Sequence, residues 1–93
     1  MEKIYIVGAV TGVENWEDKF KEARDHFFML GHDEIKTPLD YPKGLTQKEY
    51  MELSCEAVFW AEKVIVTKDW KNSKGTMAEI ALAYSFGLPV EYM

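Results

Sequence analysis

Four residues between positions 73 and 79 carry groups that could act on a charged small molecule: Ser73, Gly75, Thr76 and Glu79. The first three stand where a loop is expected to enter a helix, so their backbone N–H groups and hydroxyls lie at the positive end of a helix dipole. A phosphate would be stabilised there. The alternative is that Ser73 or Thr76 only caps the helix, a common role for these residue types.

Glu79 is unusual because it stands among small and apolar residues, in the segment 76–83. Helix side chains lean toward the N-terminus of their helix, so we expect this carboxylate to point into the same space as the anion site. It could attack the anomeric carbon of a sugar or accept a hydrogen bond from a ribose hydroxyl. The alternative is a solvent-exposed helix glutamate that the dipole stabilises.

A second glycine-bearing loop, residues 8–12, follows the first predicted strand. Its sequence matches neither the Walker pattern nor the full dinucleotide-binding fingerprint, so alone it is a weak signal. We expect this loop to face the Ser73 loop across one crevice. Two such loops at one crevice favour a phosphate site to which Gly8, Thr11 and Gly12 contribute.

The elements that must position these residues alternate between strand and helix. Short apolar or β-branched runs predict four strands, at residues 3–8, 34–38, 64–67 and 89–92. Apolar residues at intervals of three and four predict three helices between the strands. We expect a capping box at Thr11 and Glu14 to open the first helix, which Gly31 ends, and a second capping box at Thr46 and Glu49 to open the next. The third helix is predicted from about residue 76 to 86, with Gly87 as its stop.

This order predicts a single α/β domain over residues 1–93, a Rossmann-like or flavodoxin-like three-layer sandwich. Four parallel strands joined by right-handed crossovers suggest the strand order 2-1-3-4. In that order the chain reverses its direction of growth between strands 1 and 3, and ligands of such sheets bind at this switch point. Residues 8–12 and 69–75 should therefore form the crevice, which we expect to hold a nucleotide or nucleoside.

The composition fits a small packed domain and argues against one class of partner. Of the 93 residues 47% are hydrophobic and 14% aromatic, and the formal net charge is −5 with no run of Lys or Arg. Such a chain offers no patch that would neutralise the phosphates of polymeric nucleic acid. A domain of this size with so many aromatic residues is expected to form a homodimer or a higher homo-oligomer.

Signals for targeting, redox chemistry and metals are absent from the sequence. The first residues run straight into a strand pattern and no apolar stretch approaches about 20 residues, which predicts a cytoplasmic protein without a membrane partner. Cys55 is the only cysteine and is expected to be a small apolar helix residue. His26 and His32 have no metal-ligand spacing, so we expect no metal, and no cofactor is implied.

Several short motifs along the chain carry a family resemblance. On these residues the sequence resembles the nucleoside 2-deoxyribosyltransferase family, especially its short members, over nearly the whole chain. The last motif is the most specific. The motifs are Ile4-Tyr5-Ile6-Val7-Gly8 with Thr11-Gly12, Glu49-Tyr50-Met51, Ala61-Glu62, Asp69-Trp70, and Ser73-x-Gly75-x-x-x-Glu79-x-x-x-Ala83-x-x-x-Gly87.

The resemblance implies a role for each matching residue. In that family the glutamate that matches Glu79 attacks the sugar C1′, expels the base and leaves a covalent deoxyribosyl-enzyme. Family members that act on free nucleosides carry an aspartate six residues earlier, and those that cleave monophosphates carry a phosphate-binding serine; here the residue is Ser73. Tyr5 matches a tyrosine near the sugar, although it could also be plain core, and Trp70 belongs to a motif of the substrate site.

One departure from the family leaves two functions open. The acid that protonates the leaving base falls near Ser54, which cannot supply a proton at a matched pKa. Glu52, Glu56 or Glu62 could stand in, or could form a solvated helix face. The first hypothesis is an enzyme that cleaves or exchanges the N-glycosidic bond of a 2′-deoxynucleoside 5′-monophosphate through Glu79. The second is a non-catalytic protein that sequesters a nucleotide or a nucleotide-derived signal.

Overall fold

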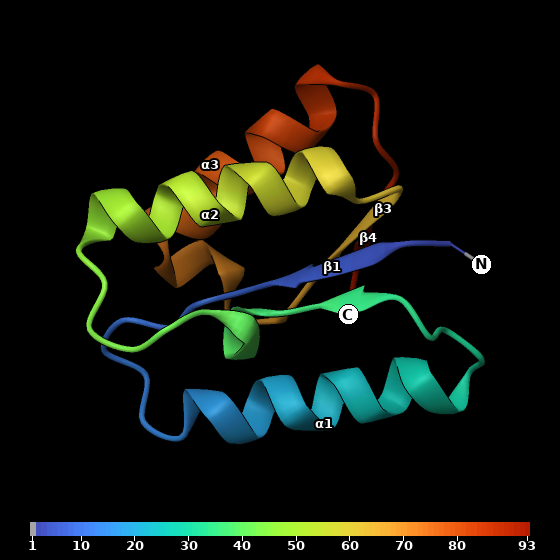
Figure 1. The fold of residues 1–93 in the computed structure, drawn as a ribbon, viewed down its shortest axis with the longest axis horizontal. Helices are drawn as coiled ribbons and strands as arrows, with labels where there is room; N and C mark the ends of the chain where they lie inside the picture. The colour runs from blue at the N-terminus through green and yellow to red at the C-terminus, as the bar shows by residue number, and fades with distance from the viewer. Residues whose placement is uncertain (1) are drawn as a thin grey trace.

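The computed structural model describes residues 2–93, and its centre is a four-stranded parallel sheet (Figure 1). The strands are β1 (Ile4–Val7), β2 (Ile35–Lys36), β3 (Lys63–Val66) and β4 (Val90–Tyr92), and their order in the sheet is β2-β1-β3-β4. Every neighbouring pair is parallel. The predicted α/β class, the parallel sheet and the strand order are therefore confirmed.

Three helices cover the two faces of this sheet (Figure 1). Helix α1 (Trp16–Met29) lies on one face, and α2 (Gln47–Trp60) and α3 (Lys74–Ser85) lie together on the other. Two short 3₁₀ helices, η1 (Pro38–Asp40) and η2 (Trp70–Asn72), occupy the loops that follow β2 and β3. The loops after β1 and β3 thus emerge at the same edge of the sheet, as the site requires.

The side chains of β1 alternate between the two layers, which explains its continuous apolar run. Ile4 and Ile6 pack in a cluster with residues of α1, including Phe20. Tyr5 and Val7 pack in a second cluster with residues of α2 and α3. All four strand residues are fully buried. A central strand buried on both faces gives the loop that follows it a rigid base.

The start of α1 differs from the sequence prediction. The capping box predicted at Thr11 and Glu14 does not form, and the helix begins at Trp16 without a side-chain cap. Its N-cap is Asn15, in the left-handed region at φ 58°. Thr11 instead enters a turn with Gly12, whose φ is 76°. Because this turn uses the residue expected to cap the helix, the loop runs on before α1 can begin.

The other helix ends carry the signals that the sequence predicted. Gly31 follows the last turn of α1 with φ 101°, as a helix-ending glycine does. At α2 the hydroxyl of Thr46 accepts the backbone N–H of Glu49 (3.2 Å), and the Glu49 carboxylate accepts the backbone N–H of Thr46 (2.9 Å). Helix α3 starts at Lys74, slightly before the predicted position, with Ser73 as its N-cap. Across residues 2–93, no helix combines the length and apolar character needed to cross a bilayer.

Candidate functional site

A cavity of about 370 Å³ opens beyond the carboxyl end of β1, at the predicted switch point. Its walls come from the loop after β1, the start of α1, the chain between η1 and α2, and the first turns of α3. This volume is within the usual range for small-molecule sites. Six of the residues predicted to bind or act on a ligand line it, namely Gly8, Thr11, Ser73, Gly75, Thr76 and Glu79.

Glu79 lies in the wall of this cavity with only 2% of its surface exposed. Its Oε2 is the one buried side-chain nitrogen or oxygen within residues 2–93 that lacks a hydrogen-bond partner. Burial raises the pKa of this carboxyl from 4.5 to about 7, and the hydroxyls of Tyr5 and Ser54 oppose the rise only in part. The alternative of a solvent-exposed helix glutamate is therefore wrong. A buried acceptor without a partner is costly, and a ligand with a donor group would satisfy it.

Three tyrosines and Ser54 share the surroundings of Glu79. The hydroxyl of Tyr41 donates to that of Tyr5 (3.0 Å), which lies 3.1 Å from Ser54 Oγ. Burial raises the pKa of Tyr41 to about 12 and raises those of Tyr5 and Tyr50 as well, with the nearby Glu79 carboxylate adding to all three shifts. The tyrosines are therefore neutral hydroxyl groups at physiological pH. Tyr41 and Tyr50 line the cavity, whereas Tyr5 is fully buried behind the lining.

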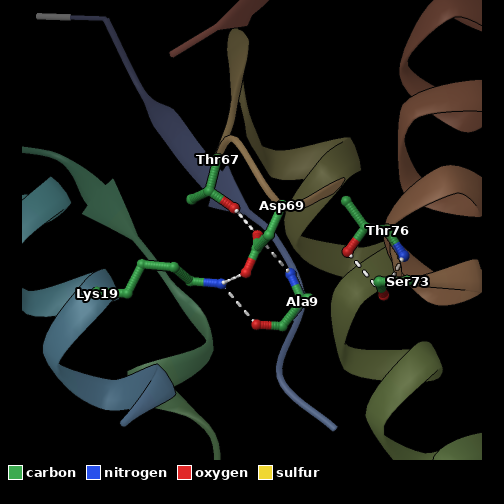
Figure 2. A network of polar contacts seen from close by, with 6 residues as sticks. All are labelled: Ala9, Lys19, Thr67, Asp69, Ser73 and Thr76. Carbon is green, nitrogen blue, oxygen red and sulfur yellow. Dashed lines mark hydrogen bonds and ion pairs between the residues drawn. The ribbon is translucent and has the colours of Figure 1, made fainter. Parts of the chain in front are cut away.

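The N-terminus of α3 forms a second polar part of the wall. Ser73 Oγ accepts the backbone N–H of Thr76 (3.2 Å) and also its hydroxyl (3.0 Å) (Figure 2). Ser73 is thus the cap of α3, as the alternative interpretation held. In both contacts Ser73 is the acceptor, so its own O–H remains a donor that a ligand oxygen could accept. Capping and anion binding are therefore compatible at this residue.

A polar network centred on Asp69 joins the loops after β1 and β3 (Figure 2). The carboxylate of Asp69 accepts the hydroxyl of Thr67 (2.7 Å) and the backbone N–H of Ala9 (3.3 Å). Lys19 Nζ pairs with the same carboxylate (2.7 Å) and donates to the Ala9 carbonyl (2.6 Å). Partial burial disfavours the charged carboxylate, but the hydrogen bonds from Lys19 and Thr67 hold the pKa of Asp69 below its usual value. A Cβ at Gly8 would collide with Thr67 Oγ1, so this position requires glycine.

The outer wall of the cavity comes from residues that the sequence did not identify as part of a site. Trp16, at the start of α1, supplies an aromatic surface on which a flat ring could stack. Glu17 follows it, and its Oε2 lies 3.7 Å from Nζ of Lys43 in the loop opposite. The remaining outer residues are mostly uncharged and belong to the chain between η1 and α2; they are Pro38, Pro42, Gly44, Leu45, Thr46 and Gln47.

Three residues predicted to bind the ligand do not line the cavity, and one of them, Tyr5, is fully buried behind its wall. Gly12 is exposed, in the turn that precedes α1. Trp70 packs against the cluster beneath α2 and α3, and its ring centroid lies 5.5 Å from that of Tyr92. The structure therefore brings the predicted Ser73–Glu79 motif and part of the residue 8–12 loop to one cavity and leaves Tyr5, Gly12 and Trp70 outside it.

The acids considered as substitutes at Ser54 also lie outside the cavity. Glu52 and Glu56 are exposed on α2, and Glu62 is exposed where it accepts the backbone N–H of Lys3 (2.9 Å). No group of three His, Cys, Asp or Glu side chains that could hold a metal ion occurs in the described chain, residues 2–93. Among the described residues, Glu79 is therefore the only carboxylate buried at the inner wall, since the other lining acid, Glu17, is partly exposed.

Comparison with other proteins gives one match. No curated protein and no solved structure matches the chain. One family model, described as Domain of unknown function (DUF4406), matches residues 2–92, which is nearly the whole of the fold that forms the cavity. The chain therefore belongs to the DUF4406 family.

Proposed function

We propose that this chain is a cytoplasmic protein that binds a 2′-deoxynucleoside 5′-monophosphate in the cavity and cleaves or exchanges its N-glycosidic bond, with Glu79 as the nucleophile. The observation that carries the proposal is the state of Glu79. Its carboxyl is buried in the wall of a ligand-sized cavity, and Oε2 has no hydrogen-bond partner. A carboxylate oxygen free to approach a ligand is what attack on a sugar carbon requires.

The phosphate site of this proposal is the N-terminus of α3. Ser73, Gly75 and Thr76, at the cap and first turn of the helix, line the same cavity as Glu79. The helix dipole adds a positive potential there, which favours a bound anion. Ser73 and Glu79 also match the residue types that the resemblance associates with monophosphate substrates. A 5′-phosphate held at Ser73 would place the sugar toward Glu79, one to two turns along the helix.

The proposed reaction has two steps. Ionised Glu79 Oε2 attacks C1′ and forms a C1′–O bond while the bond from C1′ to the base nitrogen breaks, and that electron pair leaves with the base, which takes a proton from solvent. Water then attacks C1′, the ester bond breaks with its electron pair returning to Glu79, and a proton is released to solvent. A second base in place of water gives exchange rather than hydrolysis.

The second candidate is a protein that holds a nucleotide without turnover, and the surroundings of Ser54 favour it. Ser54 is fully buried and lies 3.1 Å from the Tyr5 hydroxyl, and none of the acids near it in sequence reaches the cavity. A leaving base therefore has no side-chain acid of suitable pKa on that side. In this case the same carboxylate accepts a hydrogen bond from a sugar hydroxyl, and the ligand stays intact.

The test compares wild type with Glu79→Gln and uses Glu52→Gln, an exposed glutamate of α2, as matched control. Each protein is incubated with a panel of deoxynucleoside monophosphates and the free nucleosides, and released base is measured by chromatography. If the chain is an enzyme, wild type and Glu52→Gln should release base. In Glu79→Gln the rate of base release should fall by roughly 10³-fold or more, with little change in ligand affinity. If the chain only binds the nucleotide, no protein should release base, wild type should retain intact ligand, and Glu79→Gln should bind it with lower affinity. If wild type neither binds nor cleaves any nucleotide, both candidates are wrong.

A further inference from the structure

Apart from Lys74 at its first position, the outer surface of α3 carries no charge. From residue 75 to residue 90 the only charged side chain is that of Glu79, which is buried on the inner side of the helix. Beyond Lys74, the residues that α3 and its C-cap present to solvent are Met77, Ala78, Ala81, Tyr84, Ser85 and Phe86. Helices that are apolar on every side are normally covered on every side. We call these six residues the α3 face.

Aromatic side chains extend the α3 face on both flanks. Phe59 of α2 packs edge-on against Phe86, with ring centroids 4.9 Å apart, and the two side chains remain 58% and 60% exposed. On the other flank the hydroxyls of Tyr84 and Tyr92 lie 3.0 Å apart. Tyr84 is 58% exposed. At about 100 Å² for each half-exposed aromatic, the patch reaches about 400 Å², the size of the largest apolar patch on a typical protein surface, which is often an interaction site.

The distribution of charge indicates what covers this face. The chain has a net charge of −5, and exposed Glu49, Glu52 and Glu56 make the neighbouring surface of α2 acidic. A basic partner would be attracted to the acidic surface of α2 and not to the uncharged α3 face. A second copy of the chain is repelled wherever acidic surfaces meet, and the uncharged α3 face is where two copies can approach without opposing like charges. The preferred occupant is therefore the same face of another copy.

We propose that the α3 face pairs with itself across a two-fold axis, with the two α3 helices antiparallel and Ala81 close to the axis. Such an interface is self-complementary, as the commonest homodimers are, and antiparallel packing sets the two helix dipoles in opposition. Small residues at the centre, Ala78 and Ala81, let the helices approach, while the aromatic residues on the flanks enclose them. This proposal concerns the outer side of α3 and does not depend on the chemistry at its inner side.

The first test is the mass in solution of wild type, Ala81→Glu and the matched control Met29→Glu, measured by sedimentation at about 100 μM, far above a micromolar dissociation constant. Met29 is 82% exposed at the end of α1, on the opposite side of the sheet. We expect twice the monomer mass for wild type and Met29→Glu, and the monomer mass for Ala81→Glu with an unchanged helical circular dichroism spectrum. A monomeric wild type, or a dimer that only Met29→Glu disrupts, would overturn the proposal.

The second test covers the case in which Ala81→Glu fails to fold. In a Cys55→Ser background, Ala81→Cys should form an interchain disulfide under mild oxidation, because residues at a two-fold axis face themselves. Met29→Cys in the same background should not. Disulfide formation at Met29→Cys alone, or equal formation by both variants, would show that the α3 face is not the contact between copies.

Discussion

The buried carboxyl of Glu79 should make the stability of the fold depend on pH in an unusual direction. Its pKa is about 7 in the folded chain, against an ordinary value of 4.5 that the unfolded chain restores. The folded state therefore binds this proton more tightly, so the group lowers the free energy of unfolding as pH rises from about 4.5 to 7. Above that window the group lowers the free energy of unfolding by about 3.5 kcal/mol in full, at about 1.4 kcal/mol for each pKa unit.

Glu79→Gln removes this titration while keeping the shape of the side chain. The free energy of unfolding, from urea titrations, should fall by about 2.5 kcal/mol more in wild type than in Glu79→Gln between about pH 5 and pH 8. The difference between the two proteins cancels the titration of all other groups. Glu56→Gln, at an exposed position of α2, is the control and should follow wild type. If wild type and Glu79→Gln lose the same stability over this range, the carboxyl is not held in the folded state as described.

Three further outcomes follow from the same structure. Gly8→Ala should lower the free energy of unfolding by about 1–3 kcal/mol, because the new Cβ meets Thr67 Oγ1, and adding Thr67→Ala should restore part of the loss in urea titrations. Ser73→Asp should still cap α3, with stability within about 0.5 kcal/mol of wild type, but should weaken monophosphate binding at least about tenfold in calorimetry; unchanged affinity would contradict the phosphate role. Lys19→Met should lower the free energy of unfolding by about 1 kcal/mol at neutral pH, because it removes the partner of the Asp69 carboxylate. The pKa of Asp69 is low in the folded chain, so this carboxylate stabilises the fold less as pH falls, and the difference between Lys19→Met and wild type should shrink in acid.

The sequence predicted the sheet well because its signals were local and repeated. Ile4–Val7 and the β-branched run at Val64 are typical of strands buried on both faces, and Gly31 and the pair Thr46 and Glu49 marked helix ends where the structure has them. The prediction at Thr11 failed for a physical reason. A capping pattern is also a good turn pattern, and Gly12 at positive φ made the turn the better solution.

The sequence predicted the residues of one wall of the cavity and did not predict those of the opposite wall. The motif from Ser73 to Glu79 lies on one helix, so its spacing alone placed its residues together. Tyr41 and Lys43 come from irregular chain, where no periodicity indicates direction, and Trp16 stands at the start of a helix. All three meet the motif only through the tertiary fold. The prolines and glycine of residues 38–44 signalled an irregular segment, but not that it faces a ligand.

Because of the Asp69 network, the two sides of the cavity should differ in flexibility. The loops after β1 and β3 share several short hydrogen bonds and an ion pair, so neither loop can move far without the other. We therefore expect the side of the cavity next to Ala9 and Asp69 to keep its conformation when no ligand is bound. The ion pair between the opposite side and α1, Lys43 with Glu17, is exposed and 3.7 Å long, so salt screens it. Ligand entry should therefore depend on how often this side opens, so that ionic strength alters the rate of association more than the fit of the ligand once bound.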